Sequence, residues 1–407
     1  MSVTIIKANY PMLEKIFPFY FIVSPGLEDL ALNECTTKWP EFFPEDPLPP
    51  FNKTFGGFEA EMPMEKGLLL NQILKIPTRI LLRFADFKCR DLPKLFKKIK
   101  NLDWSPFLSG HLPQIKVSAH QSRLFHTQKI EKTIEEALQT YFKAKPPKKK
   151  YFETAKERPP ITLFFRFAED TCTISLDTSG DPLYKRSYRP FIGKAPLREN
   201  LGAALCFSLK KTLEKVFPQE NQFHLIDPMC GSGTFLLEGK YWSRPNQNRS
   251  FSYLAFPLFQ SSPPKLIDPK NQTEELFQSF QGYDQDSNVI KGTKENGLPI
   301  DETISLKTHD FLSEEKLEDL PSSGVVLINP PYGKRIPLGK KPQVYYKNLF
   351  EKIKMKISPK AFGILLPKDQ LSFLKKTDPY ILKEKKTFKN GGIPVDFLIF
   401  CKRPSLH

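Results

Sequence analysis

The pattern of apolar and polar residues divides the chain into two parts with different element orders. In the front half, the apolar run 16–23 predicts a buried strand, and 26–35 has the one-face apolar spacing of a helix. From about residue 190 onward, helix, strand, glycine turn, helix and strand alternate, which is typical of a parallel α/β sheet. The pattern therefore predicts an α+β front half followed by an α/β domain.

Shorter patterns predict the remaining elements. Turn residues between alternating apolar positions indicate a hairpin at 52–62. Near the C-terminus, 388–400 predicts a closing hairpin that turns at Asn390-Gly391, a favoured turn dipeptide. The segment 244–267 shows no pattern that assigns it a structure. Helices are expected at 66–76, 93–100 and 127–142, and strands at 79–87, 114–119, 161–167 and 171–176.

Four predicted strands of the α/β half end in a polar side chain. Asp227, Asp284 and Asp310 follow three of them, and Asn329 follows the strand 324–328. The carboxyl ends of parallel strands meet at one edge of the sheet, where α/β folds bind cofactors. We therefore expect these four side chains to line one binding site.

The loop after the first of these strands reads DPMCGSGT. Gly231 and Gly233 allow the backbone to pass close to a ligand, although such a turn alone also fits an ordinary strand–helix connection. The spacing is neither the dinucleotide fingerprint nor a P-loop. Cys230 is expected to be a small buried residue and not a nucleophile. Farther along, Asp284 could accept hydrogen bonds from both hydroxyls of a ribose, and Phe311 could border an adenine.

The tetrapeptide NPPY, Asn329 to Tyr332, raises a separate chemical hypothesis. The Asn329 side-chain oxygen and the Pro330 carbonyl can both accept hydrogen bonds from a planar amino group. Pro330 and Pro331 stiffen this backbone, since proline fixes φ and restricts the residue before it. Tyr332 can stack on a base. These roles predict catalysis by orientation and electrostatic preorganisation, with the base unstacked to reach the site.

At these two motifs the chain resembles the S-adenosylmethionine-dependent N-methyltransferases of the Rossmann-like class, whose hallmarks are D-P-x-C-G-S-G and N-P-P-Y. A narrower resemblance is to the THUMP-containing RNA guanine-N2 methyltransferases of the RlmL type, which act on bacterial 23S ribosomal RNA. It rests on LDTSGDPLYKRSYR at 176–189 and APLRENL at 195–201. It extends to 19–35 and 102–142, so it covers most of the chain.

The resemblance implies a fold and a domain order. The implied fold is a C-terminal Rossmann-like class I methyltransferase domain, with a mostly parallel seven-stranded sheet and a C-terminal antiparallel hairpin. Ferredoxin-like and THUMP domains of the α+β type are expected before it. The implied ranges are 1–70 for the ferredoxin-like region, 71–178 for the RNA-binding THUMP domain, 179–195 for a linker and 196–407 for the methyltransferase domain.

The resemblance also implies a cofactor, an acceptor and their residues. S-adenosylmethionine is the expected methyl donor, and the N2 amino group of a guanosine in 23S ribosomal RNA is the expected acceptor. Asp284 is expected at the ribose, and Asp310 with Phe311 at the adenine. The NPPY residues are the expected catalytic group, with Asn329 also at the cofactor. The residues expected around the rest of the cofactor are Asp227, Pro228, Cys230, Gly231, Gly233 and Thr234.

The charge of the chain bears on its partner. The net charge is +16 and the sequence pI is about 9.3, which favours a polyanionic partner. The front half is dense in Lys and Arg, which predicts an RNA-binding face, although each single cluster also fits a solvated surface. Lys97 and Lys98 are candidates for RNA contact. Arg186 and Arg189 are candidates as well, with packing at the junction as an equal alternative.

Other features argue against several classes of protein. No apolar run reaches the roughly 20 residues of a membrane-spanning helix, and 16–23 lacks a cleavage site, so we expect a cytoplasmic protein. The six cysteines form no C-x-x-C pair and the six histidines show no ligand spacing, so we expect no metal. We also expect a monomer without a second methyltransferase unit after His407.

Two alternatives to an RNA guanine-N2 methyltransferase stay open. NPPY alone also fits an N6-adenine methyltransferase that acts on DNA. A catalytically silent RNA-binding or ribosome assembly protein is the other alternative, although it would not need the acidic strand ends. Ser187, Gly202 and Lys334 depart from the usual residues of the family, which leaves the exact RNA target open.

Overall fold

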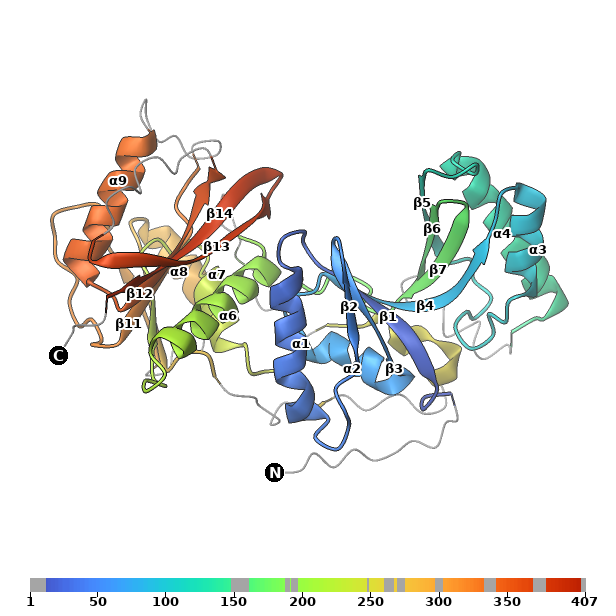
Figure 1. The fold of residues 1–407 in the computed structure, drawn as a ribbon, viewed down its shortest axis with the longest axis horizontal. Coiled ribbons are helices and arrows are strands. Elements are labelled where there is room, and N and C mark those ends of the chain that lie inside the picture. Colours follow the sequence, from blue (N-terminus) through green and yellow to red (C-terminus); the bar gives the residue numbers. More distant parts are fainter. Residues whose placement is uncertain are drawn as a thin grey trace. The chain divides into compact units, whose positions relative to one another are not determined.

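The computed structural model consists of two compact units, each assembled from separate stretches of the chain (Figure 1). Unit 1 comprises Met1–Val23, Phe42–Leu183 and Arg249–Asp268, and unit 2 comprises Ser24–Glu41, Tyr184–Asn248 and Pro269–His407. The sequence predicts continuous domains, whereas these units are discontinuous. The residues that the structure describes are 12–147, 161–186, 191, 197–246, 249–259, 267–268, 275–296, 303–332, 342–368 and 378–403.

Unit 1 is built on one seven-stranded sheet with the order β2-β3-β1-β4-β7-β6-β5. The long strand β4 joins its two sides, because residues 79–82 pair with β1 and residues 81–88 pair with β7. The regions predicted as ferredoxin-like and THUMP domains therefore share one sheet. The strands are β1 (Ile16–Ile22), β2 (Phe51–Thr54), β3 (Gly57–Pro63), β4 (Arg79–Lys88), β5 (Gln114–His120), β6 (Thr162–Ala168) and β7 (Thr171–Asp177).

Helix α3 of unit 1 forms where the sequence supplies both a cap and an apolar stripe. In α3 the Asp91 carboxylate accepts a hydrogen bond from the Lys94 N–H at 2.7 Å and caps the first turn. Leu95 and Ile99, four residues apart, are the buried side chains of this helix, and its lysines lie on the exposed face. The helices are α2 (Met64–Ile73), α3 (Leu92–Asn101) and α4 (Thr127–Ala144).

Part of the segment without a predicted structure folds into unit 1. Residues 249–259 contain two 3-10 turns, η1 (Ser252–Ala255) and η2 (Pro257–Phe259). Arg249 donates hydrogen bonds to the carbonyls of Pro182 and Ser179 at 2.8 and 3.1 Å. The Phe256 ring packs edge to face on Phe107, with centroids 5.4 Å apart. In the sequence, residues 249–259 lie between two stretches that belong to unit 2. In the structure they contribute to the core of unit 1.

Unit 2 contains a second seven-stranded sheet with the order β10-β9-β8-β11-β12-β14-β13. The first five strands of this order run parallel, and β14 pairs antiparallel with both β12 and β13. This arrangement confirms the predicted Rossmann-like fold with a C-terminal antiparallel hairpin. The strands are β8 (His224–Asp227), β9 (Ser279–Asp284), β10 (Ile304–Thr308), β11 (Gly324–Ile328), β12 (Ala361–Pro367), β13 (Tyr380–Asn390) and β14 (Ile393–Lys402).

The turn of the closing hairpin differs from the prediction. Asn390 is the last residue of β13 and pairs with Ile393, the first residue of β14. The two turn residues are therefore Gly391 and Gly392, with φ of +58° and +84°. Two consecutive left-handed residues are characteristic of a type I′ turn and favour glycine at both positions. Asn390 remains in the strand.

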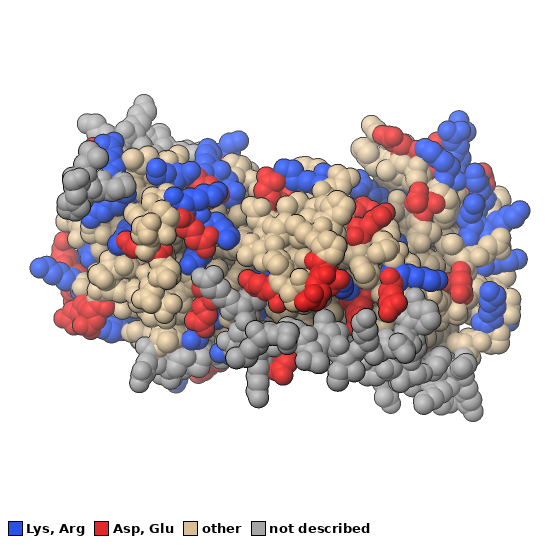
Figure 2. Space-filling model, turned by 60° about the horizontal axis from the view of Figure 1, so that its bottom comes forward, with Lys and Arg blue, Asp and Glu red and all other residues tan. Residues whose placement is uncertain are grey.

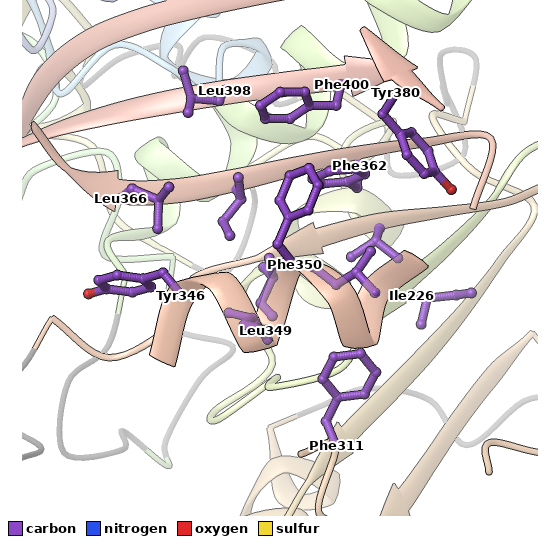
Figure 3. Close-up of a cluster of buried hydrophobic side chains, with 14 of the residues drawn as sticks. Ile226, Phe311, Tyr346, Leu349, Phe350, Phe362, Leu366, Tyr380, Leu398 and Phe400 are labelled. Atoms are coloured by element: carbon purple, nitrogen blue, oxygen red, sulfur yellow. The ribbon is translucent and has the colours of Figure 1, made fainter. Parts of the chain in front are cut away.

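Helices cover both faces of the unit 2 sheet. On one face, Gly239 of α7 (Thr234–Lys240) lies against Leu225 and Phe280. On the other face, side chains of α9 (Pro342–Lys352) and of the π-helical turn η3 (Ile353–Ile357) pack against Ile226 and Val326 (Figure 3). Leu225 and Ile226 are neighbours in β8 and so point to opposite faces. Helices α6 (Glu199–Val216) and α8 (Ser287–Glu295) complete this unit.

Most of helix α1 (Glu28–Phe42) belongs to unit 2, although it lies near the start of the chain. Gly26, just before it, is so close to the Thr387 carbonyl that a Cβ would come within 2.1 Å of that oxygen. Lys38 forms an ion pair with Glu34 at 2.9 Å, and these side chains are 2% and 0% exposed. The Lys38 amine also lies 3.9 Å from the centroid of the Trp242 ring. The N-terminal helix therefore contributes to the core of the α/β unit.

Arg186 and Glu238 form a second buried ion pair in unit 2. The Arg186 Nε donates to both carboxylate oxygens of Glu238 at 3.0 and 3.1 Å, and both side chains are 1% exposed. Arg186 also donates to the side-chain oxygen of Asn246 at 3.4 Å. Arg186 is therefore not a surface contact for RNA, and the alternative of packing at the junction is the one that the structure supports. Arg189 lies outside the described residues.

The buried position of this pair predicts a large effect on stability. We expect Arg186→Ala to lower the free energy of unfolding of unit 2 by about 3–5 kcal/mol, because it leaves the Glu238 charge buried without its main partner. Chemical denaturation followed by tryptophan fluorescence would measure this loss, with Trp39 and Trp242 reporting on unit 2 and Trp104 on unit 1. Lys307→Ala is the matched control, since the Lys307–Asp319 pair is 47% and 81% exposed. We expect it to change stability by less than about 1 kcal/mol, and equal effects of the two variants would contradict the assignment.

Candidate active site

The carboxyl edge of the parallel strands brings together the polar side chains that the sequence places at strand ends. Asp227 ends β8, and its partner in β9 is Gly282, so Asp284 lies two residues farther along that strand. On the other side, Val326 of β11 pairs with Ile226. Asn329 therefore also lies two residues beyond the level of Asp227. The central acid is flanked by Asp284 on one neighbouring strand and by Asn329 on the other.

The loop between β8 and α7 is held in place by hydrogen bonds from β9 and α8. The Cys230 N–H donates to the Tyr283 carbonyl at 2.8 Å, and the Gly231 N–H donates to the Asp284 carboxylate at 3.1 Å. The Gly231 carbonyl accepts from the Thr293 hydroxyl at 2.7 Å. These bonds fix the position of the loop relative to β9 and α8.

The glycines of this loop are required by its conformation. Gly231 and Gly233 have φ of +52° and +75°, in the left-handed region. A Cβ built on Gly231 would meet no atom within 4 Å, so there is open space beside the backbone. Gly233 is the N-cap of α7, whose first N–H groups lack partners within the helix. The loop therefore has both the room and the donors for the polar end of a ligand.

Asp284 is preoriented by two backbone donors. One carboxylate oxygen accepts from Gly231 N–H, and the other accepts from the Asp286 N–H at 3.0 Å. The side chain is only half-buried, and each carboxylate oxygen can accept a further hydrogen bond. This geometry fits the predicted grip on the two hydroxyls of a ribose. Asp310, at the next strand end, is exposed and accepts from the Leu312 N–H at 2.9 Å.

Burial controls the ionisation of the groups at the end of β8. Burial raises the pKa of Asp227 from 3.8 to about 8; the Met229 N–H opposes the rise and the nearby Asp284 adds to it. The Cys230 thiol has a pKa well above its ordinary value because of burial and, next, the two carboxylates. A thiol that stays protonated is a poor nucleophile. Cys230 is thus the small buried residue that the sequence predicts.

NPPY is held on both sides by side chains from later in the chain. The Tyr332 hydroxyl donates to the side-chain oxygen of Asn329 at 2.6 Å and accepts from the Asn390 side-chain amide at 3.3 Å. The Tyr346 hydroxyl of α9 donates to the Pro331 carbonyl at 2.9 Å. The next residue back, Tyr345, points its hydroxyl at the Met229 sulfur, 3.6 Å away. Helix α9 therefore contacts both the NPPY segment and the glycine loop.

Comparison with known proteins identifies the family of this domain. Residues 186–396, more than half of the 407-residue chain, match the model of UPF0020, described as the RMKL-like methyltransferase domain. The chain belongs to this family. The predicted RlmL-type methyltransferase family is confirmed, and with it the dependence of this UPF0020 domain on S-adenosylmethionine.

Individual relatives agree with the UPF0020 assignment. The "Ribosomal RNA large subunit methyltransferase K/L" of Marinomonas sp. is 31% identical over 341 residues, which are 78% of this chain and 44% of the relative. A putative RNA methyltransferase of Synechocystis sp. is 29% identical over 331 residues, 78% of this chain and 80% of the relative. The chain spans less than half the length of the K/L relative.

A solved structure shares the fold of the whole chain. The structure of SMU.472, a putative methyltransferase complexed with SAH, has a TM-score of 0.73 and 22% identity, and the match covers 96% of this chain and 99% of that one. At this identity the likeness shows the fold alone. It extends beyond the UPF0020 domain to the residues before it.

Phe311 differs from its expected place beside the adenine, and Tyr332 makes a contact in addition to its expected one. Phe311 is 2% exposed and packs in the core with Ile226 and Leu349, so it has no open face for an adenine (Figure 3). Tyr332 is half-buried, and its hydroxyl is engaged with Asn329. This contact of the hydroxyl with Asn329 is one that the sequence did not suggest.

Within the described ranges, no three His, Cys, Asp or Glu side chains are grouped so as to hold a metal ion. The helices described there include none that is both long and apolar enough to cross a membrane. All six cysteines are buried and free.

The raised pKa of Asp227 predicts how stability depends on pH. In the folded protein the pKa of Asp227 is about 8, above the ordinary 3.8, so the folded state favours the protonated acid. The contribution of this group to the free energy of unfolding is therefore complete below pH 3.8 and is lost as the pH rises toward 8. Asp227→Asn keeps an oxygen for the Met229 N–H but cannot ionise. We therefore expect the melting temperature of the variant, relative to the native protein, to rise across this pH range and to level off above it. Calorimetry at several pH values would measure the difference, and a constant difference would contradict it.

Proposed function

We propose that this protein is an S-adenosylmethionine-dependent RNA methyltransferase that methylates the N2 amino group of a guanosine, in ribosomal RNA of the large subunit. The observation that carries the proposal is the position of Asn329 beside Asp227 and Asp284 at one edge of the sheet. The names of the K/L and Synechocystis relatives support RNA as the substrate.

The acceptor side of the site is NPPY. An exocyclic amino group of a purine is a weak nucleophile, because its lone pair is delocalised into the ring. In our proposal the side-chain oxygen of Asn329 and the carbonyl of Pro330 accept hydrogen bonds from the two N–H groups and turn the lone pair toward the methyl donor. The bond from Tyr346 to the Pro331 carbonyl keeps this backbone in place before the substrate arrives. Orientation then supplies most of the rate enhancement.

The cofactor side is formed by the glycine loop and the acidic strand ends. Bound S-adenosylmethionine would supply an electrophilic methyl group on a sulfonium. The chain would hold it with Asp284 at the ribose, Asp310 at the adenine side, and Gly231 and Gly233 beside the amino-acid portion. The N–H groups of Gly231 and Asp286, which already bind Asp284, hold its carboxylate in the orientation that this contact needs.

The RNA-binding surface is proposed to lie on unit 1, in the region predicted as a THUMP domain. Lys97 and Lys98 are exposed on α3, on the side away from the buried Leu95 and Ile99. Lys and Arg side chains gather over the part of unit 1 that carries α3 and α4, at the right-hand end of Figure 2. The exposed Phe125, 60% exposed before α4, adds an aromatic ring on which an unpaired base could stack.

The assignment of Asn329 and Asp284 predicts that substitutions of these two residues affect different quantities. We expect Asn329→Ala to lower the methyl-transfer rate by about 100-fold or more, because it removes an acceptor that orients the amino group, while RNA binding stays largely intact. Asp284→Ala is the matched variant and should raise the dissociation constant of the cofactor roughly 10- to 100-fold. Single-turnover kinetics and calorimetric titration would measure the two quantities. Full activity of the Asn329 variant would overturn its proposed role.

The substrate itself is tested by nucleoside mass spectrometry of a strain that lacks this gene. We expect N2-methylguanosine to be lost at one position of large-subunit ribosomal RNA, and to be restored by the native gene but not by Asn329→Ala. Loss of N2-methylguanosine from transfer RNA would retain the chemistry and change the substrate. Loss of N6-methyladenine from DNA would replace the proposal by a DNA methyltransferase, and no change in any nucleoside would favour a silent binding protein.

A further inference from the structure

The tip of the C-terminal hairpin reaches the acceptor side of the site. Asn390 is the last residue of β13, and its side-chain amide donates to the Tyr332 hydroxyl at 3.3 Å. The Tyr332 hydroxyl in turn donates to the side-chain oxygen of Asn329 at 2.6 Å. Three side chains thus form one directed row of hydrogen bonds that ends at the residue proposed to hold the amino group.

The sheet topology explains how Asn390 arrives there. β14 runs antiparallel to β12, and its residue Val395 pairs with Pro367 at the carboxyl end of β12. The turn that precedes β14 therefore lies at the same edge as the ends of the parallel strands. Because the two turn residues are Gly391 and Gly392, the loop is short and Asn390 stays within the paired part of the hairpin. The hairpin register thereby fixes the backbone position from which the Asn390 side chain reaches Tyr332.

The direction of the hydrogen bonds matters for the amide of Asn329. A tyrosine hydroxyl has one proton, and here it goes to the Asn329 oxygen, because the Asn390 NH2 group occupies the hydroxyl as a donor. A flipped Asn329 amide would turn its own NH2 group toward this proton and lose the bond. The row therefore holds the oxygen, and its second lone pair, in one orientation.

We propose that Asn390 is a positioning residue for methyl transfer, which acts through the Tyr332 hydroxyl to fix the side-chain oxygen of Asn329 as the acceptor. The inference rests on the proposed function, since it assigns that oxygen to the amino group of the target base. It adds a residue of the C-terminal hairpin, which contacts Tyr332 and acts on Asn329 through it.

The decisive variant is Asn390→Asp, which keeps the size of the side chain and replaces its donor by an acceptor. The Tyr332 proton then turns toward the new carboxylate and leaves Asn329. We expect kcat to fall roughly threefold to tenfold with KM for RNA and for cofactor unchanged. The loss should shrink as the pH falls toward the carboxyl pKa of about 4, because the protonated acid donates as the amide did. Lys389→Ala, an exposed neighbour on the same strand, is the control and should leave kcat unchanged.

A double-mutant cycle separates positioning from general damage to the hairpin. In Tyr332→Phe the row is already broken, so adding Asn390→Ala should cause no further loss of kcat, whereas two independent losses that multiply would overturn the proposal. Unchanged kcat in Asn390→Asp would overturn it as well, and so would a fall in kcat accompanied by an equal rise in KM for the cofactor.

A measurement without substrate distinguishes failure of this inference from failure of the proposed function. The side-chain amide signals of Asn329 and Asn390 can be followed by NMR in the full chain. We expect Tyr332→Phe to shift both pairs of signals, and Asn390→Asp to shift those of Asn329. If the shifts occur in a protein that methylates no RNA, the row stands and the proposed function fails. If the native protein methylates RNA and Asn390→Asp shifts no Asn329 signal, the row itself is refuted.

Discussion

The parallel pairing of β8 with β11 is the constraint on which the site depends. These strands are about a hundred residues apart in sequence, yet their register places Asn329 two residues beyond the level of Asp227. The pairing of β8 with β9 does the same for Asp284 on the other side. A shift of one residue in either register would turn these side chains to the opposite face of the sheet. The cofactor side and the methyl-acceptor side of the site meet because the hydrogen bonds between the strands specify where each strand ends.

Much of this arrangement could be predicted from the sequence. Each strand end that carries Asp227, Asp284, Asp310 or Asn329 follows a short apolar run, and polar groups at the ends of parallel strands converge by topology alone. The cap of α3 is also a local signal, since it depends on residues within one turn of the chain. The glycines of the loop mark its left-handed positions locally, although bonds from β9 and α8 hold the loop in place. An element could be predicted wherever the contacts that determine it join residues close together in the sequence.

The parts that could not be predicted depend on contacts between distant segments. Nothing in the composition of α1 indicates that Lys38 will lie on the ring of Trp242, about 200 residues away. The same holds for Arg186, whose charge fits contact with RNA, whereas in the structure it pairs with the buried Glu238. Phe311 follows an acidic strand end, but its packing against α9 removes it from the site. In each case the side chain is suited to two environments, and only the tertiary partner decides between them.

The exchange of segments between the units has a consequence for the function of the front half. Unit 2 includes most of α1, and unit 1 includes 249–268, so neither unit is complete without sequence from the other half. Deleting the N-terminal residues would therefore remove the buried Glu34–Lys38 pair from the catalytic unit, and a loss of activity would say nothing about RNA binding. A separation of recognition from catalysis in this chain must come from substitutions on the surface. The same reasoning applies to NPPY, because its supports, Tyr346 and Asn390, lie on elements that follow it in the chain. A site preorganised in this way forms only when the last strand of the sheet is in place.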